Sequence, residues 1–295
     1  MSELDTPAAL EHRYAEVNGV RLHYVTAGEG PLILFAHGFP EFWYAWHAQV
    51  AEFSRDHQAV AYDQRGYNLS GRSAELRSYS MRNIAEDCRQ LIGALGQEKA
   101  IVVAHDWGGA MAWMLAALHP ECIEKLVIVN APHPVLFARE LMRNPAQRAA
   151  SAYITRLIEP QAEENLGAND HEWLVKAISQ RSSREKRPDA RTLALYREAW
   201  SQPGALTGGL NYYRASPLNP AAGETRYSVE QFPKVRVPTL VIWGEKDTAL
   251  LPALLDGLDE HVTDLRIERI PEGTHWVVHE FPERVNALIR DFLQA

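Results

Sequence analysis

The sequence predicts an α/β fold in which helices cover both faces of a mostly parallel β-sheet and a helical segment is inserted into that core. Strand and helix patterns alternate over the first third of the 295 residues, an order typical of a parallel sheet. Residues 135–225 then carry helical patterns and polar loops without a convincing β run, and strand patterns return after Pro238. We therefore predict a core made of residues 1–133 and 226–295, with a helical cap over 134–225.

The individual elements follow from short patterns, taken in chain order. The dipeptide Asn18-Gly19 predicts a two-residue hairpin turn between the alternating runs on either side of it. Short apolar runs predict buried strands, and these runs are Leu32–Ala36, Ala59–Tyr62, Ile101–Ala104, Leu126–Val129 and Thr239–Trp243. A further strand is predicted over Leu265–Ile270. Apolar residues at helical spacing predict the main helices of the core, which are Met81–Leu95, Gly108–Leu118 and Glu283–Leu293.

Composition limits the classes of function. Hydrophobic residues make up 46% of the chain and charged residues 23%, which are ordinary values for a packed protein. The net charge of −8 and the lack of a basic run argue against nucleic acid and anionic membranes as partners. The two cysteines, Cys88 and Cys122, are too few for a disulfide scaffold. The N-terminus resembles no signal peptide and no apolar run is long enough for a membrane helix, so we expect a cytoplasmic protein.

A strand-to-helix turn carries the residue that predicts the chemistry. The segment Ala104-His105-Asp106-Trp107-Gly108 lies where a predicted buried strand meets a predicted helix. Small residues at its first and fifth places let the two backbones approach, and the middle residue is then presented at the carboxyl end of the sheet. A carboxylate is already ionised at pH 7, so Asp106 can attack an sp3 carbon and form an alkyl ester that water then cleaves. The structural alternative is that Asp106 caps the following helix.

A glycine-containing turn is expected beside this carboxylate. The turn His37-Gly38-Phe39 follows the strand Leu32–Ala36 and so lies at the same end of the sheet. The backbone N–H groups of Phe39 and Trp107 can converge there as an oxyanion hole for ester hydrolysis. His37 itself is expected to hydrogen-bond to the backbone and is left out of the catalytic set.

Ester hydrolysis also needs a base, and His275 is the histidine best placed for this role. It lies in a loop after the last predicted strand, and an imidazole is the side chain that titrates near neutral pH. His279 is more typical of a surface position or a helix start. Asp247 follows the preceding strand and is the acid predicted to orient His275, with Glu245 as its competitor.

Patterns for metals and cofactors are missing from the sequence. There is no His-Glu-x-x-His motif and no paired cysteine spacing of the kind that binds zinc. Neither a G-x-G-x-x-G motif nor a P-loop follows a predicted strand. We therefore expect a reaction without a metal and without a cofactor.

Five segments resemble the α/β-hydrolase-fold epoxide hydrolases, and they extend through nearly the whole predicted core. The segments are HGFPEFWYAWHAQV (37–50), YDQRGYNLSGRS (62–73), HDWGGAMAW (105–113), WGEKDTALLP (243–252) and EGTHW (272–276). The resemblance implies an α/β-hydrolase fold and hydrolysis of an epoxide to a vicinal diol through a covalent alkyl-aspartate ester. It implies Asp106 as the nucleophile, His275 as the base and Asp247 as the acid, in agreement with the roles assigned above.

The resemblance also implies two tyrosines in the cap that bind and protonate the epoxide oxygen. The stretch Asn211-Tyr212-Tyr213-Arg214 is similar to the family's Asn-aromatic-Tyr-Arg stretch and indicates Tyr213 rather than Tyr212. Tyr153 lies six residues before Glu159-Pro160, where the other tyrosine is expected. A phenol with a pKa near ~10 remains protonated at pH 7 and can donate to the alkoxide that ring opening produces. The structural alternative is that both tyrosines only pack.

The expected ligand is a small apolar epoxide. It would lie in the interface between core and cap, and Phe39, Trp107 and Phe137 are candidates for lining that pocket. The sequence does not distinguish a monomer from a homodimer.

Two other classes of protein with this fold remain open. Hydrolytic dehalogenases, acting on haloalkanes or haloacetates, use the same kinds of catalytic residue. This chain, however, has Phe39 where haloalkane dehalogenases commonly have an asparagine, and Trp107 and Ala110 where haloacetate dehalogenases have arginines. A non-catalytic binding protein is the third class, and the retained Asp106, Asp247 and His275 argue against it.

Overall fold

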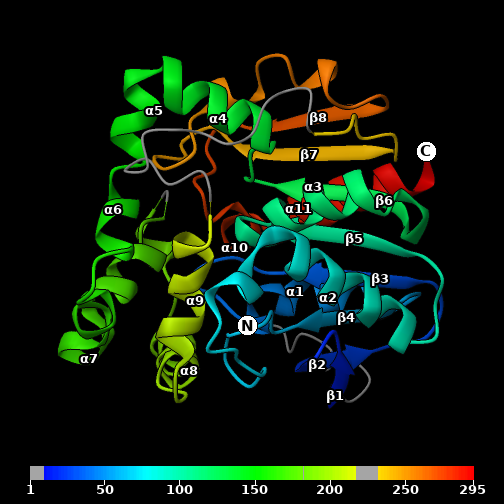
Figure 1. Cartoon of the computed structure of the whole chain (residues 1–295). Helices are drawn as coiled ribbons and strands as arrows, with labels where there is room; N and C mark the ends of the chain where they lie inside the picture. Colours follow the sequence, from blue (N-terminus) through cyan, green and yellow to red (C-terminus); the bar gives the residue numbers. More distant parts are fainter. Residues whose placement is uncertain (1–9, 182, 217–231) are drawn as a thin grey trace.

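A computed structural model describes residues 10–181, 183–216 and 232–295 of the chain. The acidic segment 1–9 and the predicted boundary at 225/226 lie outside these ranges. Helices cover a β-sheet on both faces, and further helices lie at one end of it (Figure 1). Within the described ranges, no helix combines the length and the apolar character needed to cross a membrane.

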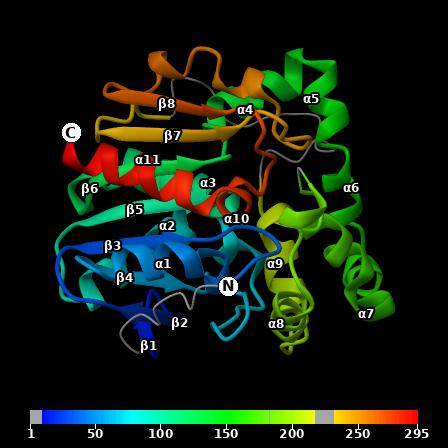
Figure 2. The ribbon, with the colours of Figure 1, turned by 180° about the vertical axis from the view of Figure 1, so that it is seen from behind.

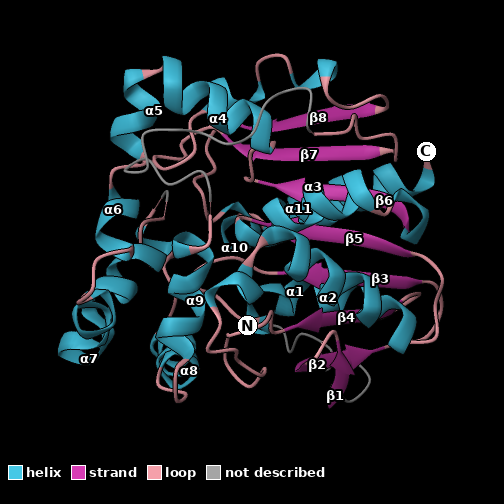
Figure 3. Ribbon diagram, viewed as in Figure 1, coloured by secondary structure: helices cyan, strands magenta, loops and turns pink. Residues whose placement is uncertain are grey.

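One sheet of eight strands forms the centre of the described structure, in the order β1-β2-β4-β3-β5-β6-β7-β8 (Figure 3). The strands are β1 (Glu11–Val17), β2 (Val20–Ala27), β3 (Leu32–Ala36), β4 (Gln58–Tyr62), β5 (Ala100–His105), β6 (Ile123–Val129), β7 (Thr239–Gly244) and β8 (Leu265–Ile270). β1 and β2 form the predicted antiparallel hairpin, β2 joins β4 antiparallel, and all later neighbours pair in parallel. The predicted mostly parallel sheet is thus confirmed.

Helices from different parts of the chain cover the two faces of the sheet. They are α1 (His47–Phe53), α2 (Met81–Ala94), α3 (Trp107–Leu118), α10 (Val277–Glu280) and α11 (Pro282–Gln294). α2 and α3 lie on one face, whereas α1 and α11 lie on the other, as the two opposite views show (Figures 1 and 2). Leu34 and Val102 belong to the apolar cluster on the α2–α3 side, while their neighbours Ile33 and Val103 belong to the cluster on the α1–α11 side. This alternation explains why central strands such as β3 and β5 are continuous apolar runs, because both of their faces are buried.

Six further helices lie between β6 and β7 in the described sequence, and we call them the inserted helices. They are α4 (Pro134–Arg143), α5 (Pro145–Ala150), α6 (Tyr153–Leu157), α7 (Ala162–Ile178), α8 (Ala190–Trp200) and α9 (Ala205–Arg214). α7 is interrupted by non-helical backbone over residues 168–171. The inserted helices gather at one end of the sheet (Figure 1), and the residues after β3, β5 and β7 share a cavity with them.

Hydrogen bonds attach α8 and α9 to loops of the core. The indole N–H of Trp200 donates to the Pro40 carbonyl oxygen (2.6 Å), in the loop after β3. The Tyr212 hydroxyl donates to the Arg65 carbonyl oxygen (3.0 Å), in the loop after β4. Because both donors are buried, losing either bond would leave a polar group unsatisfied. These contacts fix the positions of the two helices relative to the sheet.

Substituting Gly208 with alanine is expected to destabilise the protein through this same interface. Gly208, in α9, lies so close to the loop after β4 that a Cβ atom there would be 2.2 Å from the Gly66 carbonyl oxygen. We expect the free energy of unfolding to fall by about 1–3 kcal/mol, as for other overpacked sites, and urea denaturation would measure it. Gly93→Ala is the matched control, since a Cβ there meets nothing within 4 Å and α2 should gain about 0.5–1 kcal/mol. Equal changes in the two variants would contradict this account of the interface.

Candidate active site

Asp106 lies at a sharp turn between β5 and α3. Its backbone has φ 50° and ψ −120°, a left-handed conformation that costs energy for a residue other than glycine. Gly108, at the start of α3, lies so close to the end of β3 that a Cβ atom there would be 2.4 Å from the Ala36 carbonyl oxygen. The Asp106 side chain makes no capping hydrogen bond to α3. The helix-capping interpretation of Asp106 is therefore wrong, and its carboxylate is directed elsewhere.

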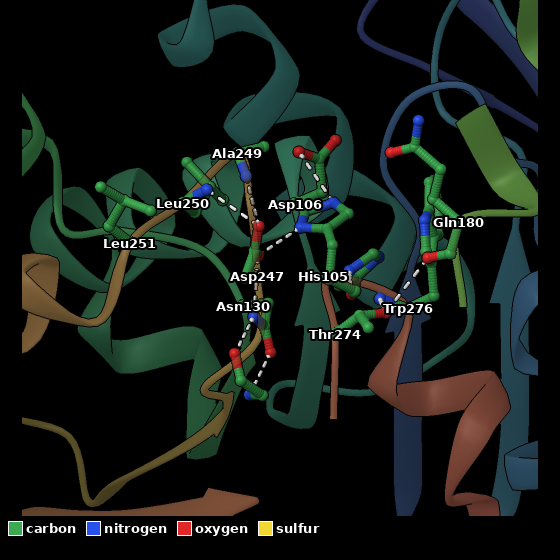
Figure 4. Close-up of polar contacts among 12 residues, drawn as sticks. His105, Asp106, Asn130, Gln180, Asp247, Ala249, Leu250, Leu251, Thr274 and Trp276 are labelled. Atoms are coloured by element: carbon green, nitrogen blue, oxygen red, sulfur yellow. Dashed lines mark hydrogen bonds and ion pairs between the residues drawn. The ribbon is translucent and has the colours of Figure 1, made fainter. Parts of the chain in front are cut away.

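His275 stands between the carboxylates of Asp247 and Asp106, both of which are labelled in Figure 4. Its Nδ1 forms a 2.7 Å hydrogen bond with Asp247 Oδ2, and its Nε2 lies 3.7 Å from Asp106 Oδ2. Because a carboxylate only accepts hydrogen bonds, Nδ1 is the protonated nitrogen toward Asp247. The three side chains come from the loops after β5, β7 and β8, so the predicted set is brought together at one edge of the sheet.

A hydrogen-bond network holds the Asp247 carboxylate, and its member Asn130 was not predicted from the sequence. Its Oδ1 accepts from the backbone N–H groups of Ala249 (2.8 Å) and Leu250 (2.9 Å). Its Oδ2 also accepts from the Asn130 side-chain amide (2.8 Å), and Asn130 Oδ1 accepts from the Gly244 N–H (2.8 Å). Asn130 directly follows β6, and this position after a predicted strand is the feature of the sequence that could have indicated its role. Asn130 thus fixes the carboxylate that in turn orients His275.

Glu245 and His279, the competing acid and the other histidine of this region, have partners outside the catalytic set. Glu245 is partly exposed and pairs with Arg269 (3.0 Å). His279 lies in the short helix α10, but its side chain is only 13% exposed and its Nε2 is 2.6 Å from Glu41 Oε1. A surface position for His279 is therefore wrong, because Glu41 binds it in the interior, whereas its place in a helix start agrees with the prediction.

The charges of the site shift the pKa values of its titratable groups. Burial by itself lowers the pKa of His275, but attraction to Asp247, the hydrogen bond with it and the charge of Asp106 more than offset this and raise the pKa to about 9. Burial opposes ionisation of Asp247, yet His275 and the donated hydrogen bonds lower the pKa of that carboxyl below its usual value. The free site thus holds an imidazolium between two carboxylates at neutral pH.

Backbone groups of the turn after β3 face the Asp106 carboxylate. The Phe39 N–H donates to Asp106 Oδ1 (2.7 Å), as expected for one half of an oxyanion hole. No hydrogen bond from the Trp107 N–H to that carboxylate occurs in the part of the chain that the structure describes. His37 is buried, and its Nδ1 forms a hydrogen bond with the Gly38 carbonyl oxygen (2.8 Å). This confirms the prediction that the His37 side chain hydrogen-bonds to the backbone.

Two tyrosines reach the site from the inserted helices. Tyr153 begins α6 and Tyr213 lies in α9, and their rings meet edge to face with centroids 6.4 Å apart. Burial, together with the negative charge of Asp106, raises the pKa of both hydroxyls, so both remain protonated. The neighbouring Tyr212 instead directs its hydroxyl to the Arg65 carbonyl oxygen, which supports the choice of Tyr213.

A cavity of about 660 Å³ joins these groups, a size typical of small-molecule sites. It is lined by Phe39, Pro40, Asp106, Ala150, Tyr153, Trp173, Lys176, Ala177, Gln180, Arg181, Tyr213, Lys246, Thr248, Ala249, Thr274, His275 and Trp276. Phe39 lines it as predicted, but Trp107 and Phe137 are not among these residues. Trp107 packs edge to face on Tyr213 (5.0 Å), and Phe137 packs against the main apolar core.

Much of the wall of this cavity was not predicted. Trp173, Lys176, Ala177, Gln180 and Arg181 line it from the second half of α7 and the residues after it. Their spacing of three and four residues indicates one helical face, but the sequence alone did not show that this face meets the site. No group of three or more His, Cys, Asp or Glu side chains suited to a metal ion occurs within the described ranges.

This fold and this arrangement of side chains define a hydrolase of the α/β class. Residues 31–282 match the alpha/beta hydrolase fold family, and the chain belongs to that family. It is 39% identical over 286 residues to the AB hydrolase superfamily protein YfhM of Bacillus subtilis (strain 168), covering 96% of this chain and 97% of that protein. It is 34% identical over 305 residues to epoxide hydrolase 4 of Mus musculus, covering 99% of this chain and 82% of that protein.

Solved structures give the same result. An epoxide hydrolase of Bacillus megaterium in complex with an inhibitor superposes with a TM-score of 0.90 at 34% identity, covering 96% of this chain and all of that one. A structure from a study of novel epoxide hydrolases in metagenomes from hot environments has a TM-score of 0.86 at 35% identity, covering 97% of this chain and 99% of that one. The predicted resemblance to α/β-hydrolase-fold epoxide hydrolases is confirmed.

Proposed function

We propose that this chain hydrolyses an epoxide to a vicinal diol through a covalent ester on Asp106. One observation carries the proposal: the Asp106 carboxylate and the rings of Tyr153 and Tyr213 line a single cavity, with His275 beside the carboxylate. A nucleophile and two hydroxyl donors on one cavity are what ring opening requires. The similarity to epoxide hydrolases supports the same reaction.

In the first step, an oxygen of Asp106 attacks one ring carbon of the epoxide and the bond from that carbon to the ring oxygen breaks. The electron pair remains on the ring oxygen, which becomes an alkoxide. Tyr153 and Tyr213 donate hydrogen bonds to this oxygen, and one of them transfers its proton. Because burial keeps both hydroxyls protonated and an alkoxide is a stronger base than a phenolate, the proton moves toward the substrate. The product of the step is an alkyl ester of Asp106.

In the second step, water hydrolyses this ester. His275 removes a proton from a water molecule that attacks the Asp106 carbonyl carbon, while Asp247 stabilises the imidazolium that forms. The Phe39 N–H stabilises the negative charge of the tetrahedral intermediate, and we assign the Trp107 N–H to the same role. Collapse of the intermediate breaks the bond from the carbonyl carbon to the alkyl oxygen, and the proton held by His275 passes to this oxygen as the diol leaves. The remaining proton of the attacking water returns to the tyrosine that gave up its own, so the Asp106 carboxylate and both tyrosine hydroxyls are restored.

We also propose a division of the chain into core and cap, and a cytoplasmic location. Residues 134–225 would act as a cap that closes the cavity over the core formed by 1–133 and 226–295. The apolar side chains Phe39, Trp173 and Trp276 in the cavity wall support a mainly apolar substrate. A cytoplasmic location is supported by the low cysteine content and acidic composition.

Isotope labelling in a single turnover tests the covalent mechanism. With enzyme in excess over an aryl epoxide in heavy-oxygen water, the oxygen added to the first diol comes from Asp106 and is light. Label then appears in the Asp106 carboxylate, and mass spectrometry of the diol and of the peptide containing Asp106 measures both. Heavy oxygen in the first diol would show direct attack by water and would overturn the covalent route.

Tyr213→Phe should slow ring opening more than ester hydrolysis. The substitution removes one hydroxyl donor, and a hydrogen bond to a developing charge is worth about 1.5–3 kcal/mol, which corresponds to a decrease of about 10–100-fold. Stopped-flow kinetics would separate the formation of the ester from its breakdown. Tyr14→Phe is the control, because Tyr14 is an exposed tyrosine outside the cavity. A larger effect on breakdown than on formation would remove Tyr213 from the first step.

A dehalogenase would need groups that stabilise a departing halide rather than an alkoxide. The edge of the cavity offers hydroxyl donors from Tyr153 and Tyr213, which suit an oxygen that must be protonated, and the relatives named as epoxide hydrolases agree with this. Side-by-side assays with an aryl epoxide, a haloalkane and a haloacetate would decide between the two reactions. Turnover of a halide without turnover of the epoxide would replace the proposed function.

A further inference from the structure

An arginine between α7 and α8 holds Trp276, the residue that follows His275. The Nη1 of Arg181 donates to the Trp276 carbonyl oxygen (3.2 Å), and its guanidinium lies over the Trp276 ring, 5.1 Å from the centroid. Its Nε donates to the Ile178 carbonyl oxygen (2.7 Å) at the end of α7, where a cation is also favoured by the helix dipole. One side chain thus joins the end of α7 to the loop that carries His275.

The residues on both sides of His275 take part in this attachment. Thr274 Oγ1 lies 3.4 Å from the Gln180 carbonyl oxygen, a contact that Figure 4 shows. Trp276 is buried, and its ring packs edge to face on the His275 imidazole, with centroids 5.0 Å apart. A displacement of the Trp276 ring would therefore be transmitted directly to His275.

The charge of Arg181 is directed to this loop rather than to an acid. No carboxylate lies within 4 Å of its guanidinium in the part of the chain that the structure describes. By contrast, Arg197 and Arg214 of the inserted helices each pair with a carboxylate at 2.6 Å. Hydrogen bonds from a charged donor are stronger than those between neutral groups. Arg181 therefore holds the Trp276 backbone and ring more firmly than a neutral side chain would.

The tyrosines of the first step are held by other contacts. The Tyr212 hydroxyl attaches α9, and with it Tyr213, to the loop after β4. The Tyr153 ring in turn packs on Tyr213. None of the described hydrogen bonds and ring contacts of Arg181 involves these three side chains. Arg181 is thus placed to act on the base without acting on the hydroxyl donors.

We propose that Arg181 is a positioning residue for ester hydrolysis: it fixes Trp276, and Trp276 keeps the His275 imidazole directed at the attacking water. The inference rests on the proposed function and adds a residue to its second step. Asp247 and His105 hold His275 from the core, at Nδ1 and at the carbonyl oxygen, and Arg181 adds support from the inserted side. Because a misplacement of about 1 Å can slow a reaction about 100-fold, a small movement of the Trp276 ring is enough to matter.

Single-turnover kinetics with an aryl epoxide tests this role. Arg181→Met removes the guanidinium and keeps most of the apolar stem. We expect ester hydrolysis to slow by about tenfold or more, whereas ester formation stays within about twofold of wild type, because ring opening needs no base. Rapid quenching followed by intact-protein mass spectrometry measures the fraction of enzyme present as the ester over time. This time course gives the rate constants of both steps.

Two further variants complete the test. Arg181→Lys keeps a cation near the Trp276 ring and a donor for its carbonyl oxygen, so ester hydrolysis should slow by only about threefold. Arg197→Met is the matched control, because Arg197 also donates to a backbone carbonyl oxygen of α7, that of Asp170 (3.2 Å), but lies outside the cavity. It should leave both rate constants unchanged. Urea denaturation checks that each variant is folded, and if Arg181→Met is not, Arg181→Lys decides by the same comparison of steps.

The possible failures have different meanings. Ester hydrolysis at the wild-type rate in the folded Arg181 variant that decides would overturn the inference and leave epoxide hydrolysis standing. Equal slowing of both steps would do the same, since it would show that Arg181 supports the inserted helices as a whole, including those that carry Tyr153 and Tyr213. If wild type forms neither ester nor diol from the aryl epoxide, the proposed function fails and the role of Arg181 fails with it.

Discussion

Asp106→Ala should abolish turnover of an aryl epoxide, with kcat/KM falling by about 10⁴-fold or more, the scale seen when a catalytic nucleophile is removed. Without the carboxylate, no ester forms, and the tyrosines and the histidine have no nucleophile to assist. The side chain is only 13% exposed and faces His275 across 3.7 Å, so no other described carboxylate of the cavity wall is available to replace it. Diol production measured over hours, with the spontaneous rate subtracted, gives the residual activity.

Two companion variants separate chemistry from folding. Asp106→Asn keeps the size of the side chain and tolerates φ 50° better than alanine, so its loss of activity reports on charge rather than backbone strain. Asp256→Ala removes an exposed carboxylate outside the cavity and should leave kcat/KM unchanged. Retention of more than a hundredth of wild-type activity in Asp106→Ala would exclude a covalent role for this residue and indicate another catalytic mechanism.

His275→Gln should trap the ester. Ring opening does not require a base, so one equivalent of substrate should bind covalently to Asp106, while kcat should fall by about 10³-fold, within the range for loss of a general base. Intact-protein mass spectrometry would show a species heavier by the mass of the substrate. His119→Gln, a partly exposed histidine beside Glu121, is the control and should show no adduct.

The charges around His275 explain why the base acts only in the second step. In the free site, Asp247 and Asp106 raise the pKa of His275 to about 9, so the imidazole is protonated at pH 7 and cannot accept a proton. Esterification removes the charge of Asp106, and the pKa of His275 then falls because one of the attractions that raised it is gone. Normal substrate binding without any adduct in His275→Gln would argue against this sequence of events.

The fold and the polar centre were predictable because they depend on local patterns. A turn of small residues between a buried strand and a helix places Asp106, and loops after two successive strands place Asp247 and His275. Because the carboxyl ends of parallel strands lie at the same edge of a sheet, these three side chains are expected to lie close together. The choice of Asp247 over Glu245 was consistent with its burial beside His275, and the assignment to the epoxide hydrolase family was confirmed by the relatives.

Features that depend on packing between distant segments could not be predicted in the same way. Phe137 was placed in the pocket because it is aromatic and lies in the insertion, yet α4 packs it on the core. The α7 wall with Arg181 and the partner of His279 both depend on how the inserted helices dock. Asn130 follows a strand, but an amide there is equally typical of a simple turn. Such contacts depend on three-dimensional distances that sequence spacing does not contain.

The insertion between β6 and β7 has a consequence for how the protein becomes active. Asp106 precedes the inserted helices and His275 follows them, and His105 and the His275 carbonyl oxygen are hydrogen-bonded although 170 positions apart. During synthesis from the N-terminus, a nascent chain can complete β5 and α3 and still lack both the base and its orienting acid. The nucleophile is therefore exposed without a means of ester hydrolysis until β7 and β8 add to β6. Catalytic turnover is thus an assay for completed folding of the last third of the chain.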